Sequence, residues 1–146
     1  MGERSRGCDD SGAGAPQRDT HAGGGIGLPG GAIVLGVAHA SLITEQENAA
    51  VVRPLASLAE GLSSVSVTWV CLAGRHRALA SGRSARVYYV LSGALTFVVS
   101  DSHPTLVRAE EAVVIPRGVV YGFEGSGTYL VINTPAFEPG DDEYAE

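Results

Sequence analysis

Two stretches decide the fold: GRHRALASGRSARVYYVLSG at residues 74–93 and EEAVVIPRGVVYGFEGSG at residues 110–127. In both, short segments rich in Val, Ile and Tyr alternate with Gly and Pro, which favour turns. Such segments are typical of consecutive β-strands joined by tight loops. The two stretches therefore predict a β-structure at the centre of the chain.

The segments around these stretches extend the same pattern. Residues 65–72 form a β-branched and aromatic run with Trp69 in its middle, and residues 33–37 can form a first strand. Residues 44–52 fit either a short helical turn or an extended segment. Further strands are expected near residues 86–91, 94–100, 105–109, 112–115, 119–124 and 128–133. This spacing, with no long segment of helical period, predicts an all-β sandwich or barrel.

The two stretches resemble the two signature motifs of the cupin family, G-x5-H-x-H-x3-E-x6-G and G-x5-P-x-G-x2-H-x3-N. Gly74 and Gly93 fall on the two glycines of the first motif, and Pro116 and Gly118 fall on the Pro and Gly of the second. The stretch TYLVINTPAFEP is similar to the last strand of many cupins. The resemblance implies a cupin-like β-barrel, a double-stranded β-helix or jelly roll.

The chain departs from the family at the metal-ligand positions. The four residues that stand there are Ala80, Gly82, Arg86 and Tyr121. None of these residue types normally binds a divalent metal. The second motif also has Glu110 and Gly125 in place of its first Gly and final Asn. We therefore expect a barrel without cofactor or metal, and a metal site elsewhere in the chain remains the alternative.

The chain divides into one domain and two tails. Residues 1–31 contain ten glycines and few large apolar side chains, which predicts a disordered N-terminal tail. The cupin-like barrel is expected over residues 32–137. Residues 138–146 hold five of the 16 acids, and a cluster of acids at a terminus is usually a solvated end.

The composition argues against several classes of function. The formal net charge is −6, and −1 without the five acids of the C-terminal tail, so the sequence predicts no nucleic-acid surface. All ten basic residues are Arg, so a catalytic lysine is excluded. The N-terminal residues lack the apolar core of a secretory signal, and no run is long enough to span a bilayer. We expect a cytoplasmic protein that binds neither nucleic acid nor membrane.

Candidate site residues follow from the alternation of side chains along a strand. If Arg86 occupies a ligand position of the family, it points into the barrel together with Tyr88. The same argument turns Tyr121 and Phe123 inward, and Trp69 is a further candidate for the lining. The predicted lumen holds a guanidinium, phenols and apolar side chains, which suit the binding of a small molecule.

A buried Arg86 needs a partner, because an isolated buried charge is costly and Arg stays protonated. Two solutions remain open: an internal carboxylate or water at the barrel mouth, or an anionic or carbonyl-bearing ligand. Arg75, Arg77 and Arg83 are expected on loops near the mouth, where positive charge favours an acidic small molecule. A merely solvated loop is the alternative.

Tyr121 and His76 are the candidates for proton transfer. A Tyr121 phenolate about 4 Å from Arg86 gains roughly 4 kcal/mol at an effective dielectric near 20. Burial opposes ionisation, so only part of this gain is expected as a lowered pKa. His76 is expected on the loop that leads into the barrel, where it can reach the pocket. The alternatives are a Tyr121 that fills the space of the lost metal and a His76 on the surface.

Two functions remain open. The first is a metal-independent enzyme that acts on a small organic molecule by acid/base chemistry, as an isomerase, epimerase, cyclase or dehydratase. The resemblance implies cyclases of natural-product biosynthesis among these. The second is a catalytically silent cupin that binds a ligand or serves as a structural or regulatory subunit. An open pocket with converging Arg86, Tyr121 and His76 favours the enzyme, and a closed lumen with Arg86 neutralised internally favours the second. A homodimer is expected through edge strands.

Overall fold

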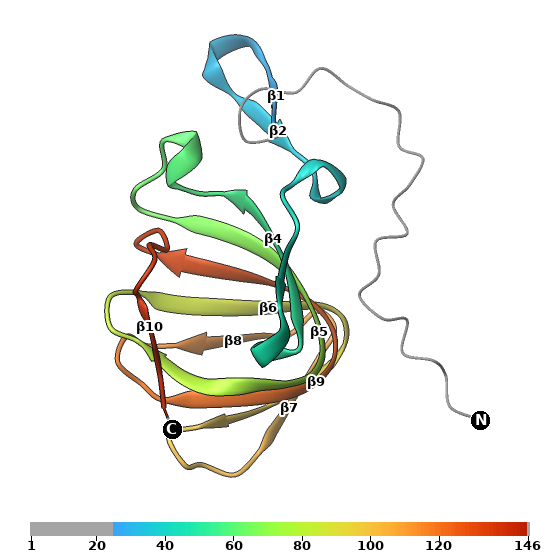
Figure 1. The fold of residues 1–146 in the computed structure, drawn as a ribbon, viewed down its shortest axis with the longest axis vertical. Coiled ribbons are helices and arrows are strands. Elements are labelled where there is room, and N and C mark those ends of the chain that lie inside the picture. The colour runs from blue at the N-terminus through green and yellow to red at the C-terminus, as the bar shows by residue number, and fades with distance from the viewer. Residues whose placement is uncertain (1–24, 146) are drawn as a thin grey trace, which may run out of the picture.

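The computed structural model describes residues 25–145, and their regular structure is almost entirely β-strand (Figure 1). The strands are β1 (Gly25–Gly27), β2 (Ile33–Leu35), β3 (Ile43–Glu45), β4 (Ala50–Ala56), β5 (Ser66–Ser81), β6 (Ala85–Val99), β7 (Thr105–Arg108), β8 (Ala112–Ile115), β9 (Tyr121–Thr134) and β10 (Asp142–Tyr144). Four single turns of 3-10 helix connect them: η1 (Pro29–Gly31), η2 (Val37–His39), η3 (Gln46–Asn48) and η4 (Leu58–Glu60). The all-β prediction is confirmed. Over the described range no helix is long and apolar enough to cross a membrane.

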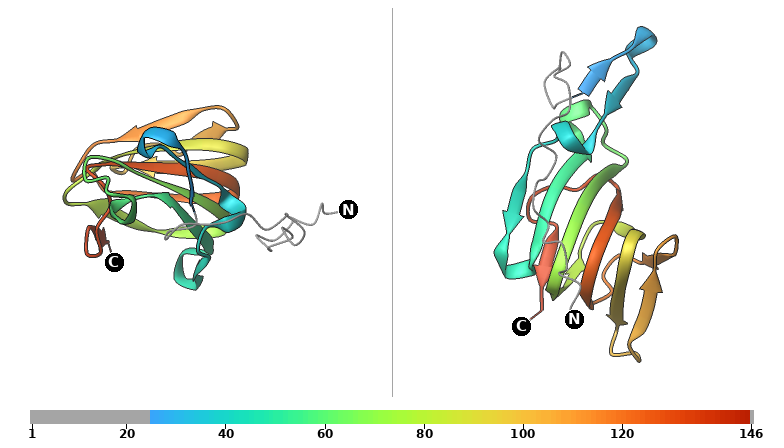
Figure 2. Two further views of the ribbon diagram at one scale, coloured as in Figure 1. Left: turned by 90° about the horizontal axis from the view of Figure 1, so that it is seen from above. Right: turned by 90° about the vertical axis from the view of Figure 1, so that its right-hand side faces the viewer.

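Three long strands build the barrel. β9 lies between β5 and β6, and pairs antiparallel with both from Tyr121 to Asn133. The sheet order is β3-β4-β5-β9-β6-β7, with β10 added to β5 and β8 added to β6. The long strands curve, so that the sheet wraps around its own core (Figure 2). The barrel is thus a single continuous sheet, which fits the cupin-like prediction.

The curvature depends on glycines where neighbouring backbones come close. Gly93 has φ +76°, and a Cβ there would lie 2.1 Å from the Ser126 carbonyl oxygen. Gly125 has φ +143°, and its Cβ would lie 2.4 Å from the Ala94 carbonyl oxygen. Only glycine adopts these conformations without strain and leaves room for the facing strand. The close approach of the facing strand therefore explains why Gly93, the last glycine of the first cupin-like motif, must be a glycine.

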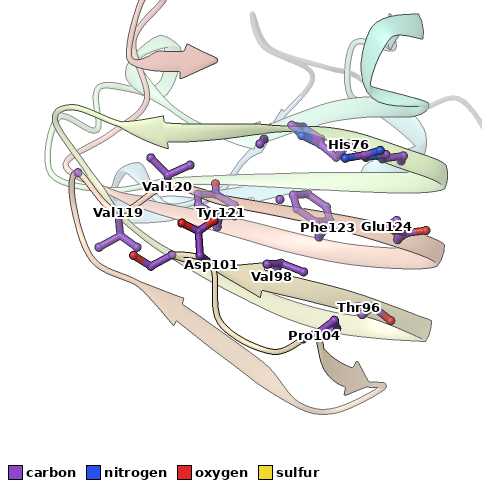
Figure 3. Close-up of a pocket in the computed structure, with 15 residues that line it drawn as sticks. His76, Thr96, Val98, Asp101, Pro104, Val119, Val120, Tyr121, Phe123 and Glu124 are labelled. Carbon is purple, nitrogen blue, oxygen red and sulfur yellow. The ribbon is translucent and has the colours of Figure 1, made fainter. Parts of the chain in front are cut away.

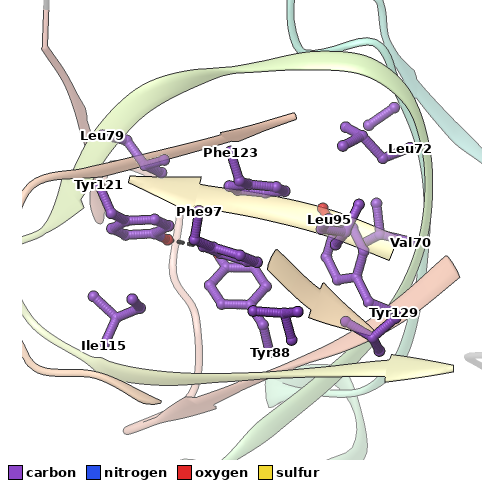
Figure 4. Packing of buried hydrophobic residues seen from close by; sticks show 13 residues of the cluster. Val70, Leu72, Leu79, Tyr88, Leu95, Phe97, Ile115, Tyr121, Phe123 and Tyr129 are labelled. Atoms are coloured by element: carbon purple, nitrogen blue, oxygen red, sulfur yellow. Dashed lines mark hydrogen bonds between the residues drawn. The ribbon is translucent and has the colours of Figure 1, made fainter. Parts of the chain in front are cut away.

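The core fills the inside of the curved sheet (Figure 4). Its centre is a cluster of five aromatic side chains, Tyr88, Phe97, Tyr121, Phe123 and Tyr129. Ring centroids are 4.7 Å apart between Phe97 and Phe123, and 5.2 Å apart between Tyr88 and Phe123. Each such pair contributes about 0.5–1.5 kcal/mol beyond the area it buries. The predicted inward direction is confirmed for Arg86, Tyr88, Tyr121 and Phe123, which are at most 4% exposed.

Both predicted tails differ from the structure where the structure describes them. Residues 1–24 and 146 lie outside the described part. Residues 25–27 form β1, which pairs with β2 in a separate two-stranded ribbon beside the barrel (Figures 1 and 2). At the other end Glu138 and Glu143 are exposed, as a solvated end requires, but Asp141 is buried and Asp142 is half-buried. β10 pairs with residues 79–81 of β5, because neighbouring acids find arginine partners on the barrel.

Several strand boundaries also differ. The strands predicted at residues 86–91 and 94–100 form the single strand β6, and those at 119–124 and 128–133 lie in β9. Arg75, His76 and Arg77 were expected on a loop but lie within β5, because Gly74, at φ +138°, bends the strand without ending it. Residues 44–52 hold one 3-10 turn between β3 and β4.

We predict that Gly93→Ala destabilises the barrel by roughly 2–4 kcal/mol, since it combines left-handed strain with a backbone clash. Gly61→Ala is the matched control, because Gly61 has a similar φ of +82° but nothing within 4 Å of the added Cβ. The control should lose only about 1 kcal/mol. Urea denaturation of the two variants checks the difference, and equal losses would show that the close approach at Gly93 is unimportant.

Candidate active site

Arg86 is the charged group at the centre of the barrel, and it is 4% exposed. Its Nε donates to Oδ1 of Asn133 at 2.6 Å, and its Nη1 donates to the Tyr121 hydroxyl at 3.2 Å. Its Nη2 donates to the carboxylate of Asp142 in β10. The strand register places Arg86 directly opposite Asn133. Of the two solutions left open by the sequence, the structure contains the internal carboxylate.

The electrostatics keep Arg86 charged. Burial by itself lowers the pKa of the guanidinium, but Tyr88, Tyr121 and Asp142 outweigh it and raise that pKa. Burial also keeps both phenols protonated. The formal negative charge that balances Arg86 at neutral pH is therefore the carboxylate of Asp142.

Tyr121 lies between the guanidinium and a second phenol. Its hydroxyl accepts from Arg86 and is hydrogen-bonded to the Tyr88 hydroxyl (Figure 4). Burial raises the pKa of Tyr121, although Arg86 and the hydrogen bonds oppose the shift. The pKa of Tyr88 is raised further, by burial and by Tyr121. The predicted lowering of the Tyr121 pKa is therefore wrong, because desolvation outweighs the charge of Arg86. Both phenols can donate protons or hydrogen bonds.

His76 provides a group of opposite character. It is partly buried in β5, and its ring stacks on Phe123 with centroids 4.6 Å apart. Its Nδ1 lies 2.8 Å from the Arg77 carbonyl oxygen. A carbonyl only accepts, so Nδ1 carries the proton and Nε2 is the basic nitrogen. Burial lowers the pKa of His76, which leaves a neutral imidazole at pH 7 that can accept a proton.

These groups border a cavity of about 100 Å³ inside the barrel. Its lining comprises Glu45, Ala50, Val52, Thr68, Val70, His76, Leu79, Arg86, Tyr88, Tyr129, Val131, Asn133, Phe137 and Asp142. The sequence-predicted residues that meet at this cavity are Arg86, His76 and Tyr88. Tyr121 is 1% exposed and is absent from the lining, so it supports Tyr88 and Arg86 without facing the cavity.

A larger hollow of about 660 Å³ lies over the same sheet (Figure 3). Exposed Val98 and Glu124 in its lining alternate with buried Phe97 and Phe123, which places this hollow on the outer face. Arg75 opens onto the hollow, opposite Glu124 in the strand register. The hollow is wide and lies mostly outside the barrel, although His76, Tyr121 and Phe123 also border it. Arg86 and Tyr88 border only the smaller cavity, where His76 joins them, and we take this cavity as the candidate site.

The predicted cluster of arginines at the mouth does not form. Arg77 places its guanidinium 3.7 Å from the centroid of the Tyr144 ring and donates to Asn48. Arg83 pairs with Glu138 at 2.9 Å and with Asp141 at 3.1 Å. Arg75 lies on the outer face, so the side chains of Arg75, Arg77 and Arg83 lie in three separate environments.

Trp69 does not reach the lumen. The residues directly before and after it in the sequence, Thr68 and Val70, both line the cavity. Trp69 lies between them in β5, so the alternation of side chains turns it to the outer face. The proposal that Trp69 binds substrate inside the barrel is therefore wrong.

Sequence reasoning missed five polar residues of the cavity: Glu45, Thr68, Tyr129, Asn133 and Asp142. A signal existed for two of them. Tyr129, Val131 and Asn133 alternate along one strand, so placing Tyr129 in the core predicts that Asn133 also faces inward. Asp142 and Glu45 lie in strands of three residues, which are too short for a pattern.

Of the four family ligand positions, Arg86 and Tyr121 lie within hydrogen-bond distance in the barrel. Across residues 25–145, no three His, Cys, Asp or Glu side chains gather in an arrangement that could hold a metal ion. The polar groups of the cavity are donors (a guanidinium, phenols, an amide, an imidazole and the Thr68 hydroxyl) and the carboxylates of Glu45 and Asp142. This set suits an organic ligand with oxygen acceptors.

No protein-family model and no curated protein sequence matches the chain. Solved structures do match. The nucleoside dehydratase Pac13 is 19% identical over 77% of this chain and 89% of that chain, with a TM-score of 0.67. A variant of Streptomyces PAC13 with uridine is 18% identical over 77% and 89%, with a TM-score of 0.68.

Two further structures extend the likeness. The polyketide cyclase RemF from Streptomyces resistomycificus is 19% identical over 76% of this chain and 83% of that chain, with a TM-score of 0.64. An RmlC-like cupin from Shewanella frigidimarina is 15% identical over 68% and 86%, with a TM-score of 0.57. At these identities the likeness concerns the fold. Together with the curved sheet and the glycines at its bends, it shows that the chain has a cupin-like fold.

Proposed function

We propose that the chain is an enzyme that binds a small anionic or carbonyl-bearing molecule in its barrel and acts on it by proton transfer. The observation that carries the proposal is the convergence of three unlike groups on one cavity: a basic imidazole, a protonated phenol and a permanent cation. Environments that push pKa values apart are typical of acid/base pairs. The proposal uses side chains in place of a metal, since the family's ligand positions hold residues that do not ligate one.

Each group has a role in the proposed chemistry. Nε2 of His76 removes a proton from a carbon next to a carbonyl, and the electron pair moves to the carbonyl oxygen. Arg86 and the Tyr88 hydroxyl stabilise the resulting enolate by charge and hydrogen bonds. Tyr121 is a positioning residue, because its hydroxyl contacts both of these groups.

The next step of the enolate then determines the reaction class. The enolate can expel a hydroxyl from the next carbon, which takes the proton from Nε2 of His76 and leaves as water; this is dehydration. It can instead attack a second carbonyl, whose oxygen takes that proton; this is cyclisation. Reprotonation on the other face gives epimerisation. The nucleoside dehydratase and the polyketide cyclase of similar fold support the first two classes, and a place in natural-product biosynthesis belongs to the same proposal. Fold alone does not transfer a substrate.

One observation favours a second function, a barrel that binds without catalysis. Arg86 is neutralised by Asp142 of the same chain, as expected for a silent cupin. A cavity of about 100 Å³ nevertheless remains inside the barrel, and the His76 imidazole and the Tyr88 phenol line it. Binding without turnover across a panel of hydroxy-ketones and acidic carbonyl compounds would favour this second function.

The proposal includes a homodimer formed through edge strands. β8 pairs only with β6 among the described strands, and Val114 on it is 65% exposed. An open edge of this kind invites a second copy. Light scattering after size exclusion should give twice the mass of 15.0 kDa, and the mass of one chain would refute the dimer.

We predict that His76→Gln lowers the turnover of the substrate found in that panel by about 10²–10⁴-fold, the usual contribution of a general base. Tyr121→Phe should lower it less, because Tyr88 keeps its own hydroxyl. His103→Gln is the control, since His103 is exposed on a turn. Chelator should leave the rate unchanged. Full activity of His76→Gln would remove the imidazole from the mechanism.

A second prediction concerns pH and stability. Folding lowers the pKa of His76 below 6.5, so the unfolded chain binds this proton more readily. The free energy of unfolding therefore falls as pH drops through about 6.5, and levels off below the pKa of the folded chain. Urea denaturation between about pH 8 and pH 5 measures this component. His76→Gln should abolish it and His103→Gln should keep it; the same slope in both would contradict the assignment.

A further inference from the structure

The C-terminal segment borders the cavity. Residues 138–145, here called the strap, begin with a turn at 139–140 and continue as β10 along the edge of β5 (Figure 1). Asp142 of the strap lines the cavity, together with Phe137 just before it. The side chain of Asp142 is 25% exposed, whereas that of its partner Arg86 is 5% exposed. Asp142 therefore stands between the buried guanidinium and solvent.

The cavity is too small for a substrate while the strap is in place. Ligand pockets for small organic molecules usually measure about 300–1,000 Å³. The space inside the barrel is about 100 Å³. Most of the other lining residues lie on β4, β5, β6 and β9, which are fixed by long ladders of hydrogen bonds. The strap and β3, which carries Glu45, are attached through ladders of only three residue pairs.

The attachment of the strap is mostly polar, although Tyr144 also packs against the edge of the hydrophobic core. β10 pairs with β5 through three residues, and Ala145 adds a backbone bond to Ala78. Tyr144 packs against Arg77 and accepts a hydrogen bond from Asn48 at 3.1 Å. Glu138 and Asp141 pair with Arg83, whose side chain is 39% exposed. Such contacts open at a lower free energy than a buried core.

Opening cannot leave Arg86 without a partner. Asn133 and Tyr121 supply neutral acceptors to the guanidinium, and Asp142 supplies the negative charge. A ligand group that replaces Asp142 must therefore be an anion that accepts hydrogen bonds from the planar guanidinium of Arg86. A carboxylate fits this requirement best. The rings of His76, Tyr88 and Tyr129 around the space favour an unsaturated or aromatic body.

We infer that the strap is a displaceable lid, and that Asp142 holds the place on Arg86 that the carboxylate of an aromatic or unsaturated monocarboxylate takes. The inference rests on the proposed function for the use of the lumen as a ligand site, but not on any turnover. It specifies the ligand as a monoanion. It also makes binding a competition between the ligand and a side chain of the protein.

The experiment is a calorimetric titration of the full chain with benzoate, and with the neutral analogue benzamide. Benzoate should bind and benzamide should not. Asp142→Asn should bind benzoate roughly tenfold tighter or more, because the competing carboxylate is gone while the side-chain size is kept. Glu143→Gln is the matched control on the same strand, since Glu143 does not pair with Arg86, and it should behave as the parent chain.

Hydrogen exchange of the unmutated chain provides a test that needs no variant. Benzoate should speed the exchange of the Ala145 amide, which bonds to Ala78 in the closed strap. Slower exchange with benzoate, or benzoate affinity that is unchanged or lost in Asp142→Asn, overturns the lid. A chain that binds benzoate and opens, but converts no carbonyl compound, keeps the lid and refutes only the proposed enzyme.

Discussion

The buried charge of Arg86 is the constraint on which the rest of the site depends. A guanidinium inside an apolar barrel requires an acceptor for each of its sides and a negative charge close by. Asn133 of β9, Tyr121 of β9 and Asp142 of β10 meet these needs from three directions. The C-terminal segment owes its ordered position largely to this requirement, and the phenols owe theirs to the guanidinium they contact.

The same barrel gives its titratable groups opposite tendencies. Desolvation favours the neutral form of every group, so it raises the pKa of the phenols and lowers that of the imidazole. The result is a neutral acid beside a neutral base in one cavity, with Arg86 as the fixed cation. At one of the ligand positions of the cupin motif the chain carries this guanidinium, which donates directed hydrogen bonds to Asn133 and Tyr121.

Much of the fold was predictable because strand patterns are local. The alternation in β6 and β9 fixed the directions of Arg86, Tyr88, Tyr121 and Phe123 once one inward position was assumed. No such position was known for β5, so Trp69 received the wrong face. Gly74 was interpreted as a turn, although a glycine can equally bend a continuous strand.

The missed part of the site depends on tertiary contacts. Asp142 lies in an acidic segment that resembles a solvated end, and only the folded barrel brings Arg86 within reach. The need of a buried Arg for a carboxylate was foreseeable, but its choice among 16 acids was not. Similarly, the predicted lowering of the Tyr121 pKa was wrong because the depth of burial decides the balance, and that depth cannot be read from the sequence.

The position of β9 between β5 and β6 also shapes the order of assembly. β5 and β6 are joined by a short turn, yet they pair with β9 and not with each other over their length. During synthesis, β5 and β6 are therefore made before their common partner. The backbone groups on their facing edges stay unpaired until residues 121–134 have been synthesised. Open edges of this kind are the usual starting points of aggregation. The central place of a late strand makes the nascent chain most vulnerable just before its barrel can close.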